Sequence, residues 1–362
     1  METASTTSTR PGKLGSSIPV KSVQDLAANS NNLTAEVLER YIRPEIDGDT
    51  VSDGESGAIP IVDLGRLFDE QFMQDEAAKL KLACEEWGFF QVTNHGIPNK
   101  VIEGIKAATE EFFKLPPEEK QKVAQLPGDV QGYGQAFVVS EDQKLDWADM
   151  YFIVIQPVQN RNMRLWPTKP SIFRDSLESY SVELKKVADC LLRSMAVNLG
   201  IDPEKFSSKF ESQTMRFNYY PPCRYADKVL GLSPHSDGAG LTLLLQASQV
   251  EGLQIKRDGS WLAIKPLPDA LIVNIGDLLE VLSNGKYKSI EHRAVIHGEK
   301  ERMSIAAFHS TSFTGTTVGP LPELVEGSEE FYKTVSMEEY IKLFISRKLD
   351  GKSLVEQMKL KK

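Results

Sequence analysis

The sequence predicts an α+β protein with a mainly β core, flanked by helices and preceded by a helical and mixed amino-terminal region. First, residues 171–200 form one long stretch in which apolar side chains recur at helical spacing. Second, the chain beyond residue 212 consists of short β-prone runs separated by Gly, Pro, Asp or Asn. Such regular short strands are typical of a closed or double-sheet β architecture. Third, 41% of the 362 residues are hydrophobic, which is enough apolar material for a large core.

Residues 1–57 are expected to be a flexible amino-terminal segment with short helices and a linker. Residues 1–17 are small and polar, which is typical of a mobile terminus. A short helix should begin after Thr34, whose hydroxyl would cap it. Residues 45–57 are acidic and rich in Gly and Ser, so they indicate a linker.

Residues 58–205 are predicted to form a mixed α/β region. A strand at 59–64, an amphipathic helix to about Glu86 and a strand at 88–92 give a compact β-α-β unit. Further helices should follow at residues 99–114, 117–124 and 171–200.

Residues 206–325 are predicted to form the β-rich core. Its expected strands are Met215–Tyr220, Gly240–Gln246, Gly252–Ile255, Trp261–Ile264, Ala270–Ile275 and Met303–Phe308. The pattern returns to helix over residues 328–359, so residues 326–362 are expected to form a carboxy-terminal helix.

Charge and cysteine content exclude several classes of protein. The chain has 42 Lys and Arg against 51 Asp and Glu, a net charge of -9, and no basic block, so we expect no nucleic-acid partner. Its three distant cysteines cannot build a disulfide framework, and no stretch approaches the ~20 apolar residues that cross a bilayer. We expect a cytoplasmic monomer without a membrane partner, although the Ser/Thr-rich start with Arg10 and Lys13 faintly resembles a transit peptide.

His235 and Asp237 lie between an apolar segment and the expected strand at 240–246. On a strand, residues i and i+2 share a face, so an imidazole and a carboxylate would lie close enough to hold one ion. These donors suit a divalent transition metal. His292 is the best candidate for a third ligand, because residues 288–295 alternate between polar and apolar like a strand.

Two histidines and one carboxylate would leave three corners of an octahedron open. That arrangement is typical of non-haem Fe(II) oxygenases, whereas a structural zinc site is closed. A lone His-x-Asp pair is common by chance, and its simplest interpretation is a pair of buried polar side chains. The additional histidine and the Arg-x-Ser pair described next favour a metal site.

Arg302 lies ten residues after His292. Together with Ser304 it begins a run in which alternate residues share one strand face. Arg offers a planar bidentate fork and Ser a hydroxyl donor, and together they suit a carboxylate. A dicarboxylate would then bridge from the metal to Arg302. Phe308 shares the same face and is expected to line the substrate pocket.

The chain contains, in order, IPIVDL at 59–64, WGFFQVTNHG at 87–96, NYYPPC at 218–223, the ligand candidates described above and the run Arg302–Ser304. In this combination it resembles the plant iron(II)- and 2-oxoglutarate-dependent dioxygenases, from about residue 18 onward. Within that family it is most similar to the branch of senescence-related dioxygenases and codeine O-demethylase-like enzymes.

The resemblance implies a double-stranded β-helix, or jelly roll, that binds Fe(II) through His235, Asp237 and His292. The far carboxylate of the co-substrate 2-oxoglutarate would lie on Arg302 and Ser304. Oxygen would be the other co-substrate, succinate and carbon dioxide would be products, and ascorbate would serve as reductant.

The resemblance also implies that Asn218 and Tyr220 line the co-substrate pocket. The organic substrate is expected to be a small aromatic plant specialised metabolite or hormone-like compound, which is hydroxylated or oxidatively O-demethylated. Relatives suggest that the carboxy-terminal helix around Phe344 forms a lid. Further wall residues are expected among the aromatic side chains Tyr133, Phe137, Tyr151 and Phe152.

Two other classes of protein stay open. One is a non-redox or 2-oxoglutarate-independent enzyme on the same scaffold, such as a condensing enzyme or an ascorbate-using oxidase. The other is a non-catalytic small-molecule binding protein, against which the intact ligand set and Arg-x-Ser pair argue. Substrate-dependent succinate release would separate these classes.

Overall fold

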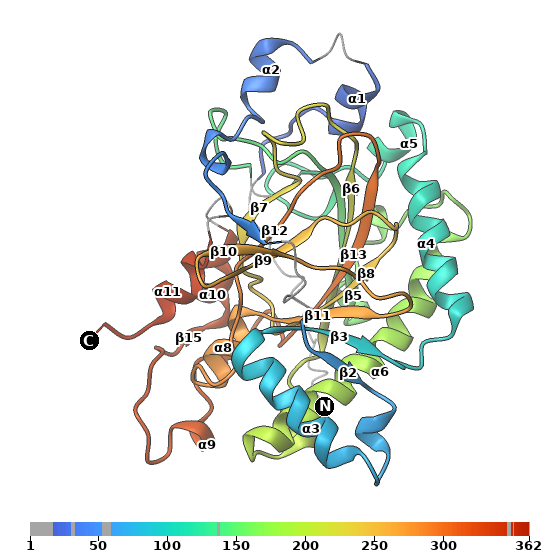
Figure 1. The fold of residues 1–362 in the computed structure, drawn as a ribbon. Helices are drawn as coiled ribbons and strands as arrows, with labels where there is room; N and C mark the ends of the chain where they lie inside the picture. The colour runs from blue at the N-terminus through green and yellow to red at the C-terminus, as the bar shows by residue number, and fades with distance from the viewer. Residues whose placement is uncertain are drawn as a thin grey trace, which may run out of the picture.

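The computed structural model describes residues 17–29, 33–52, 59–135, 138–345, 349 and 351–361. The expectation of a mobile start therefore lies almost entirely outside the described residues, and so does much of the expected linker. Within the described part, two β-sheets form the core and helices pack around them (Figure 1). None of the helices there combines the length and the apolar character that a membrane span requires.

The two β-sheets contain all the predicted site residues that are described except Asp237. The five-stranded sheet has the order β1 (Val51–Ser52), β10 (Ser260–Ala263), β9 (Leu253–Arg257), β12 (His292–Ala294) and β7 (Leu232–His235). The eight-stranded sheet has the order β2 (Ile61–Asp63), β3 (Phe89–Thr93), β11 (Leu271–Ile275), β8 (Leu241–Gln246), β13 (Arg302–Ser310), β6 (Ser212–Tyr220), β5 (Asp149–Gln156) and β4 (Gly132–Gly134). Neighbouring strands are antiparallel except β1 with β10 and β2 with β3. This double-sheet arrangement is the predicted jelly roll.

Helices lie on both sides of the sheets. The larger ones are α3 (Met73–Leu82), α4 (Asn99–Phe113), α6 (Phe173–Leu199) and α10 (Met337–Ile345). The short ones are α1 (Val23–Ala28), α2 (Ala35–Glu39), α5 (Pro117–Gln121), α7 (Pro203–Ser207), α8 (Asp277–Leu282), α9 (Pro322–Val325) and α11 (Ser353–Met358). A separate pair of strands, β14 (Thr317–Val318) and β15 (Val335–Ser336), precedes α10. In Figure 1, α4 and α6 run beside β13, β8 and β5, whereas α10 and α11 lie on the opposite side of the barrel.

An aromatic layer joins the helices to the eight-stranded sheet. Phe112 of α4 packs on Tyr151 of β5 with ring centroids 4.9 Å apart, and Phe173 of α6 packs on Phe217 of β6 at 5.4 Å. Burying such side chains contributes about 1.5–3 kcal/mol each. The long helix predicted over residues 171–200 is confirmed as α6, and its apolar face supplies half of this layer.

The predicted β-α-β unit is also present, since β2 and β3 pair in parallel and α3 connects them. The helix does not stop at Leu82 but continues as a π-helical turn through Trp87. Gly88 then takes the left-handed conformation, with φ +61°. A Cβ at this position would lie 2.1 Å from the carbonyl oxygen of Lys288, so only glycine permits the turn into β3.

Sequence analysis missed one long strand, and it predicted a single helix where the structure has several elements. Strand β5 does not appear among the predicted strands, because its side chains are buried on both faces and show no alternation of polar and apolar residues. The helix expected over residues 328–359 is instead a short strand, β15, followed by α10 and α11.

A buried carboxylate attaches the amino-terminal helix to the core. Asp149, at the start of β5, accepts hydrogen bonds from the backbone N–H groups of Val23 and Gln24 at 2.8 and 3.0 Å. The hydroxyls of Ser22 and Tyr133 donate to the same carboxylate at 2.7 and 3.2 Å. Asp149 therefore satisfies the free N–H groups at the start of α1 and neutralises the positive end of that helix.

We expect Asp149→Ala to lower the free energy of unfolding by about 1.5–3 kcal/mol, the usual contribution of hydrogen bonds to a charged group. Denaturant unfolding measures this loss, and hydrogen exchange should rise first in residues 17–29. Asp142→Ala, at an exposed position of the preceding loop, is the matched control. Unchanged exchange in residues 17–29 would contradict the role of Asp149.

Candidate metal centre and substrate cavity

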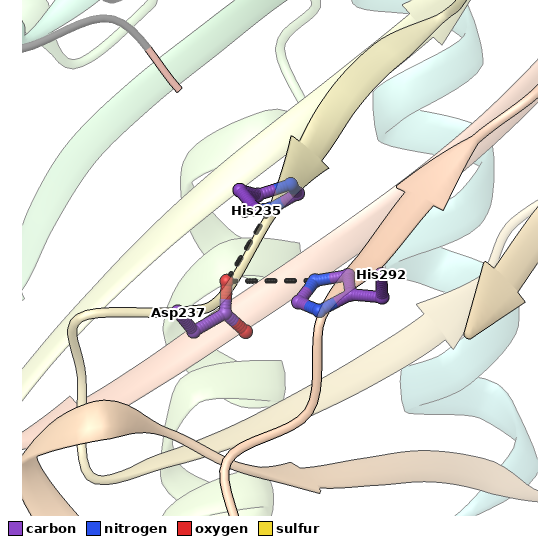
Figure 2. A group of neighbouring side chains, drawn as sticks. All are labelled: His235, Asp237 and His292. Atoms are coloured by element: carbon purple, nitrogen blue, oxygen red, sulfur yellow. Dashed lines mark ion pairs between the residues drawn. The ribbon is translucent and has the colours of Figure 1, made fainter. Parts of the chain in front are cut away.

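Three predicted ligands come together at one end of the cavity between the sheets. His235 ends β7, His292 begins β12, and the antiparallel register places the two residues directly opposite each other. Oδ1 of Asp237 lies 3.6 Å from Nε2 of His235 and 3.7 Å from Nε2 of His292 (Figure 2). All three side chains are buried. Asp237 differs from expectation in one respect, because it lies in the loop after β7 rather than on the strand.

Backbone carbonyls orient both imidazoles. Nδ1 of His235 lies 2.8 Å from the carbonyl oxygen of Ser233, and Nδ1 of His292 lies 3.0 Å from that of Ile290. Because a carbonyl oxygen only accepts, both Nδ1 atoms must carry the proton. Each Nε2 therefore directs its lone pair toward Asp237, as a metal ligand requires.

The carboxylate of Asp237 is held through one oxygen only. Its Oδ2 accepts hydrogen bonds from Thr242 Oγ1 at 2.7 Å and from Asn274 Nδ2 at 2.8 Å. These two residues are direct neighbours on β8 and β11. Oδ1, by contrast, faces the two histidines and is free to bind an ion.

Electrostatics favours the protonation states that ligation needs. Burial, with help from the nearby His235, lowers the pKa of His292 to about 4. Burial acts to raise the pKa of Asp237, but the neighbouring His292 and His235 and the hydrogen bond from Asn274 hold it well below the ordinary value. At neutral pH the site thus offers a neutral imidazole at His292 beside an ionised carboxylate.

The Arg-x-Ser pair lies on the same cavity. Arg302 and Ser304 on β13 pair with Tyr220 and Asn218 on β6, so these four side chains share the inner face. Arg302 donates through Nη2 to Gln246 Oε1 at 2.9 Å. Arg302 and Ser304 are each only 2% exposed.

Two buried polar atoms here have no partner among the described residues: Nε of Arg302 and Oδ1 of Asn218. A buried polar group without a partner costs about 1–3 kcal/mol, so such groups indicate a place for a ligand. The guanidinium beside the Ser304 hydroxyl fits a carboxylate, and two imidazoles with one carboxylate oxygen fit Fe(II). The residues present therefore fit both groups that the sequence implied.

A cavity of about 200 Å³ connects these two sets of residues and extends away from them. Ala306 and Phe308 continue the inner face of β13, as predicted. The remaining walls are mainly apolar and come from both sheets and from α10. Among them are Phe152, Leu244, Leu253, Tyr340, Phe344 and Ile345.

The prediction for Tyr133 and Tyr151 is wrong, because neither side chain lines the cavity. Tyr151 pairs with Phe217 and faces the helices on the outer side of the sheet, where its hydroxyl donates to the carbonyl of Leu165. Tyr133 packs on Phe112 in the same layer. Phe152, the next residue on β5, faces the cavity, because side chains alternate along a strand. The last candidate, Phe137, lies outside the described residues.

Sequence analysis missed the residues that position the ligands. Asn274 could have been found, since it is the one polar residue in the otherwise apolar run Leu271–Ile275. Thr242 gave no comparable signal. Arg216, which lines the cavity on β6, was also missed, although its parity with Asn218 and Tyr220 on the expected strand gave a signal.

Both ends of the chain hold the edge strand β7, which carries His235. On the amino-terminal side, Arg43 donates to Ser233 Oγ at 2.8 Å and pairs with Asp146 at 3.0 Å. Asp146 accepts from the backbone N–H of Ser233 at 3.0 Å. On the carboxy-terminal side, the N–H of Gly351 donates to the carbonyl of Pro234 at 3.0 Å. These contacts thus satisfy backbone hydrogen-bonding groups of the edge strand where no further strand covers it.

Comparisons with known families agree with the fold and the site. The amino-terminal model of the non-haem dioxygenase in morphine synthesis matches residues 59–169, and the model of the 2OG-Fe(II) oxygenase superfamily matches residues 211–311. Because the second match contains the predicted ligands and the Arg-x-Ser pair, the family evidence and the geometry concern the same residues.

Whole-chain relatives support the same assignment. S-norcoclaurine synthase 1 of Coptis japonica is 52% identical over 96% of this chain and 98% of its own length. Codeine O-demethylase of Papaver somniferum is 42% identical over 96% of this chain and 98% of its own. The crystal structure of JOX2 in complex with 2OG, Fe and JA superposes with a TM-score of 0.85 and 36% identity, covering 95% of this chain and 99% of that one.

The chain therefore belongs to the 2OG-Fe(II) oxygenase superfamily. It is a 2-oxoglutarate-dependent dioxygenase, an oxidoreductase that uses Fe(II) and 2-oxoglutarate.

We expect Asp237→Asn to weaken metal binding by more than about 100-fold, the largest loss usually seen when only an outer hydrogen bond is removed. An amide oxygen is neutral and cannot replace the carboxylate opposite two imidazoles. Anaerobic calorimetry with Mn²⁺ measures the affinity, and circular dichroism checks that the fold is intact. The control is Asp258→Asn, which changes an exposed aspartate. Equal Mn²⁺ affinity in both variants would refute the ligand role of Asp237.

Proposed function

We propose that His235, Asp237 and His292 hold the catalytic Fe(II), and that Arg302 and Ser304 hold the far carboxylate of 2-oxoglutarate. In this proposal the organic substrate is a small aromatic plant specialised metabolite or hormone-like compound, which is hydroxylated or oxidatively O-demethylated. The observation that carries the proposal is that the ligand triad and the buried guanidinium face one largely apolar cavity. Asn218 and Tyr220 complete the co-substrate end of that cavity.

Each side chain would contribute a defined task. The carbonyls of Ser233 and Ile290 keep Nε2 of the two histidines available, and Thr242 and Asn274 keep Oδ1 of Asp237 directed to the ion. Bound iron would supply the redox chemistry that couples the oxidation of 2-oxoglutarate to that of a substrate C–H bond, with ascorbate as reductant.

Arg302 would set the orientation of 2-oxoglutarate. Its Nη2 is already tied to Gln246, and a Cβ on Gly252 would lie 2.8 Å from Arg302 Cδ, so the side chain has little freedom. A fixed guanidinium binds a carboxylate without a large loss of rotamer entropy.

The walls of the cavity support an aromatic substrate. Phe152 and Phe308 lie with ring centroids 6.5 Å apart, and Leu244 and Phe344 add further apolar surface. Such walls bury a flat apolar molecule and exclude water from it. The name of the relative codeine O-demethylase agrees with a substrate of this kind. In this proposal α10, which supplies Tyr340 and Phe344, acts as the lid.

A second candidate function is a condensation without redox chemistry, which the name of the relative S-norcoclaurine synthase 1 favours. The two remaining alternatives are an ascorbate-using oxidase and a non-catalytic binding protein. A condensation needs neither oxygen nor 2-oxoglutarate, so the requirement for these co-substrates separates it from the proposed reaction.

The test is incubation of the iron-loaded enzyme with fractions of a plant metabolite extract, with and without 2-oxoglutarate. We expect succinate release in particular fractions, together with a mass change of about +16 for hydroxylation or -14 for O-demethylation. Product without oxygen and 2-oxoglutarate would instead support condensation. Oxygen uptake with ascorbate alone would support an oxidase, and binding without any product would support a binding protein.

We further propose that the protein is a cytoplasmic monomer, organised as region 58–205, catalytic core 206–325 and carboxy-terminal segment 326–362. Its three free cysteines are compatible with a reducing compartment. Light scattering should then give a mass near 40.4 kDa.

We expect Arg302→Lys to raise the KM for 2-oxoglutarate at least about tenfold and to leave the KM for the organic substrate nearly unchanged. Lysine keeps the charge but cannot form the two parallel hydrogen bonds of a guanidinium with a carboxylate. Steady-state kinetics with each substrate varied in turn measures both constants. The control is Arg224→Lys on the exposed loop after β6. An unchanged 2-oxoglutarate KM would exclude Arg302 from the co-substrate site.

A further inference from the structure

Besides Arg302, the cavity is lined by Arg216 and by Arg293, whose guanidinium is bound to Gln254 and Asp49. Arg216 lies on β6, where it pairs with Phe152 of β5 on one side and with Ala306 of β13 on the other. Directly paired residues share a sheet face, and all three line the cavity. The guanidinium of Arg216 therefore belongs to the inner wall.

The side chain of Arg216 has no polar partner within the described residues. It forms no ion pair or hydrogen bond there, and its Nε is buried without an acceptor. Asp237 is the only acidic residue among those that line the described cavity, and it faces the two histidines. A permanent charge next to apolar walls is costly unless an anion compensates it.

Arg216 is separated from the level of Arg302 by one row of side chains. Asn218 and Ser304 form that row, and Tyr220 and Arg302 form the row beyond it. At a rise of about 3.3 Å per residue, Arg216 lies about 13 Å along the strand from the level of Arg302. One dicarboxylate held between the metal triad and Arg302 leaves Arg216 without a counter-charge.

Aromatic side chains surround the guanidinium of Arg216. Phe152 is its direct neighbour on β5, and Phe308 follows on β13, two residues beyond Ala306. The two rings lie 6.5 Å apart and form an apolar surface beside the charge. A ligand that fits both features has an aromatic body and one acidic oxygen group.

We propose that Arg216 anchors an oxyanion of the organic substrate, a carboxylate or an ionised phenol, while the aromatic body of that substrate packs on Phe152 and Phe308. This inference rests on the proposed function, because it identifies the substrate class of the same cavity. It makes Arg216 a specificity-determining residue that selects acids over their neutral analogues.

The test uses probes that differ only in the acidic group: 2-naphthoate, its methyl ester and 2-naphthol. The protein is loaded with Mn²⁺ and 2-oxoglutarate, and binding is followed by calorimetry. We expect at least tenfold tighter binding of 2-naphthoate than of the ester if the anchor is for a carboxylate. If it is for a phenol, 2-naphthol should bind at least tenfold tighter than the ester and show the absorption band of naphtholate when bound.

In Arg216→Gln we expect the preference for the acidic probe to disappear and the Kd of 2-oxoglutarate to stay within twofold. Arg216→Lys should keep part of the preference, because it keeps the charge. The matched control Arg224→Gln removes the same charge from an exposed position and should change neither value.

Several results would overturn the inference. They are equal affinity of the wild-type protein for all three probes, failure of every probe to bind, a preference that persists in Arg216→Gln, or an equal loss in Arg224→Gln. A parallel loss of 2-oxoglutarate affinity would also overturn it, since Arg216 would then belong to the 2-oxoglutarate site. The proposed function fails separately, if the wild-type protein with Mn²⁺ does not bind 2-oxoglutarate.

Discussion

The register between β7 and β12 is the constraint on which the metal centre depends. It places His235 opposite His292, although 57 positions separate them along the chain. A slip of one residue would turn His292 to the other face of the sheet, because side chains alternate along a strand. The inner sides of the two sheets then define the rest of the site. Arg302, Ser304 and Phe308 follow one another on β13 at intervals of two and four residues, so in the proposed function the cavity has a co-substrate end and a substrate end.

The cavity contains buried polar groups whose hydrogen bonding is incomplete. The outer face of the eight-stranded sheet packs aromatic rings against α4 and α6. On the inner face, Nε of Arg302, Oδ1 of Asn218 and Nε of Arg216 are buried without protein partners in the described chain. Folding alone gains nothing from such groups, whereas a ligand that pairs with them recovers their desolvation cost. In the proposed function, the same sheet thus stabilises the fold on one side and binds ligands on the other.

Sequence reasoning located the candidate metal ligands and the Arg-x-Ser pair more accurately than the residues that form the cavity walls. His235, Asp237, His292, Arg302 and Ser304 were predicted from residue type and spacing, and the structure brings them together around one cavity. Strand parity correctly placed Phe308, since β13 has a clear start. It could not be applied to Tyr151, because β5 was not predicted as a strand and its burial on both faces does not reveal which side chains face inward. The role of Thr242 depends on strands that pair only in three dimensions, so no local pattern indicates it, whereas for Asn274 the only local signal was a polar residue within an apolar run.

The attachment of β7 by both ends of the chain has a consequence for the order of folding. The contact between Arg43 and Ser233 joins residues 190 positions apart, and Gly351 reaches back to Pro234 from near the other end. Closing such long loops is entropically costly and slow compared with forming local hairpins. The edge strand that carries His235 is therefore expected to be completed late, after the central strands have assembled. Iron would then bind only after the polypeptide has reached its native state, and its binding would not promote folding.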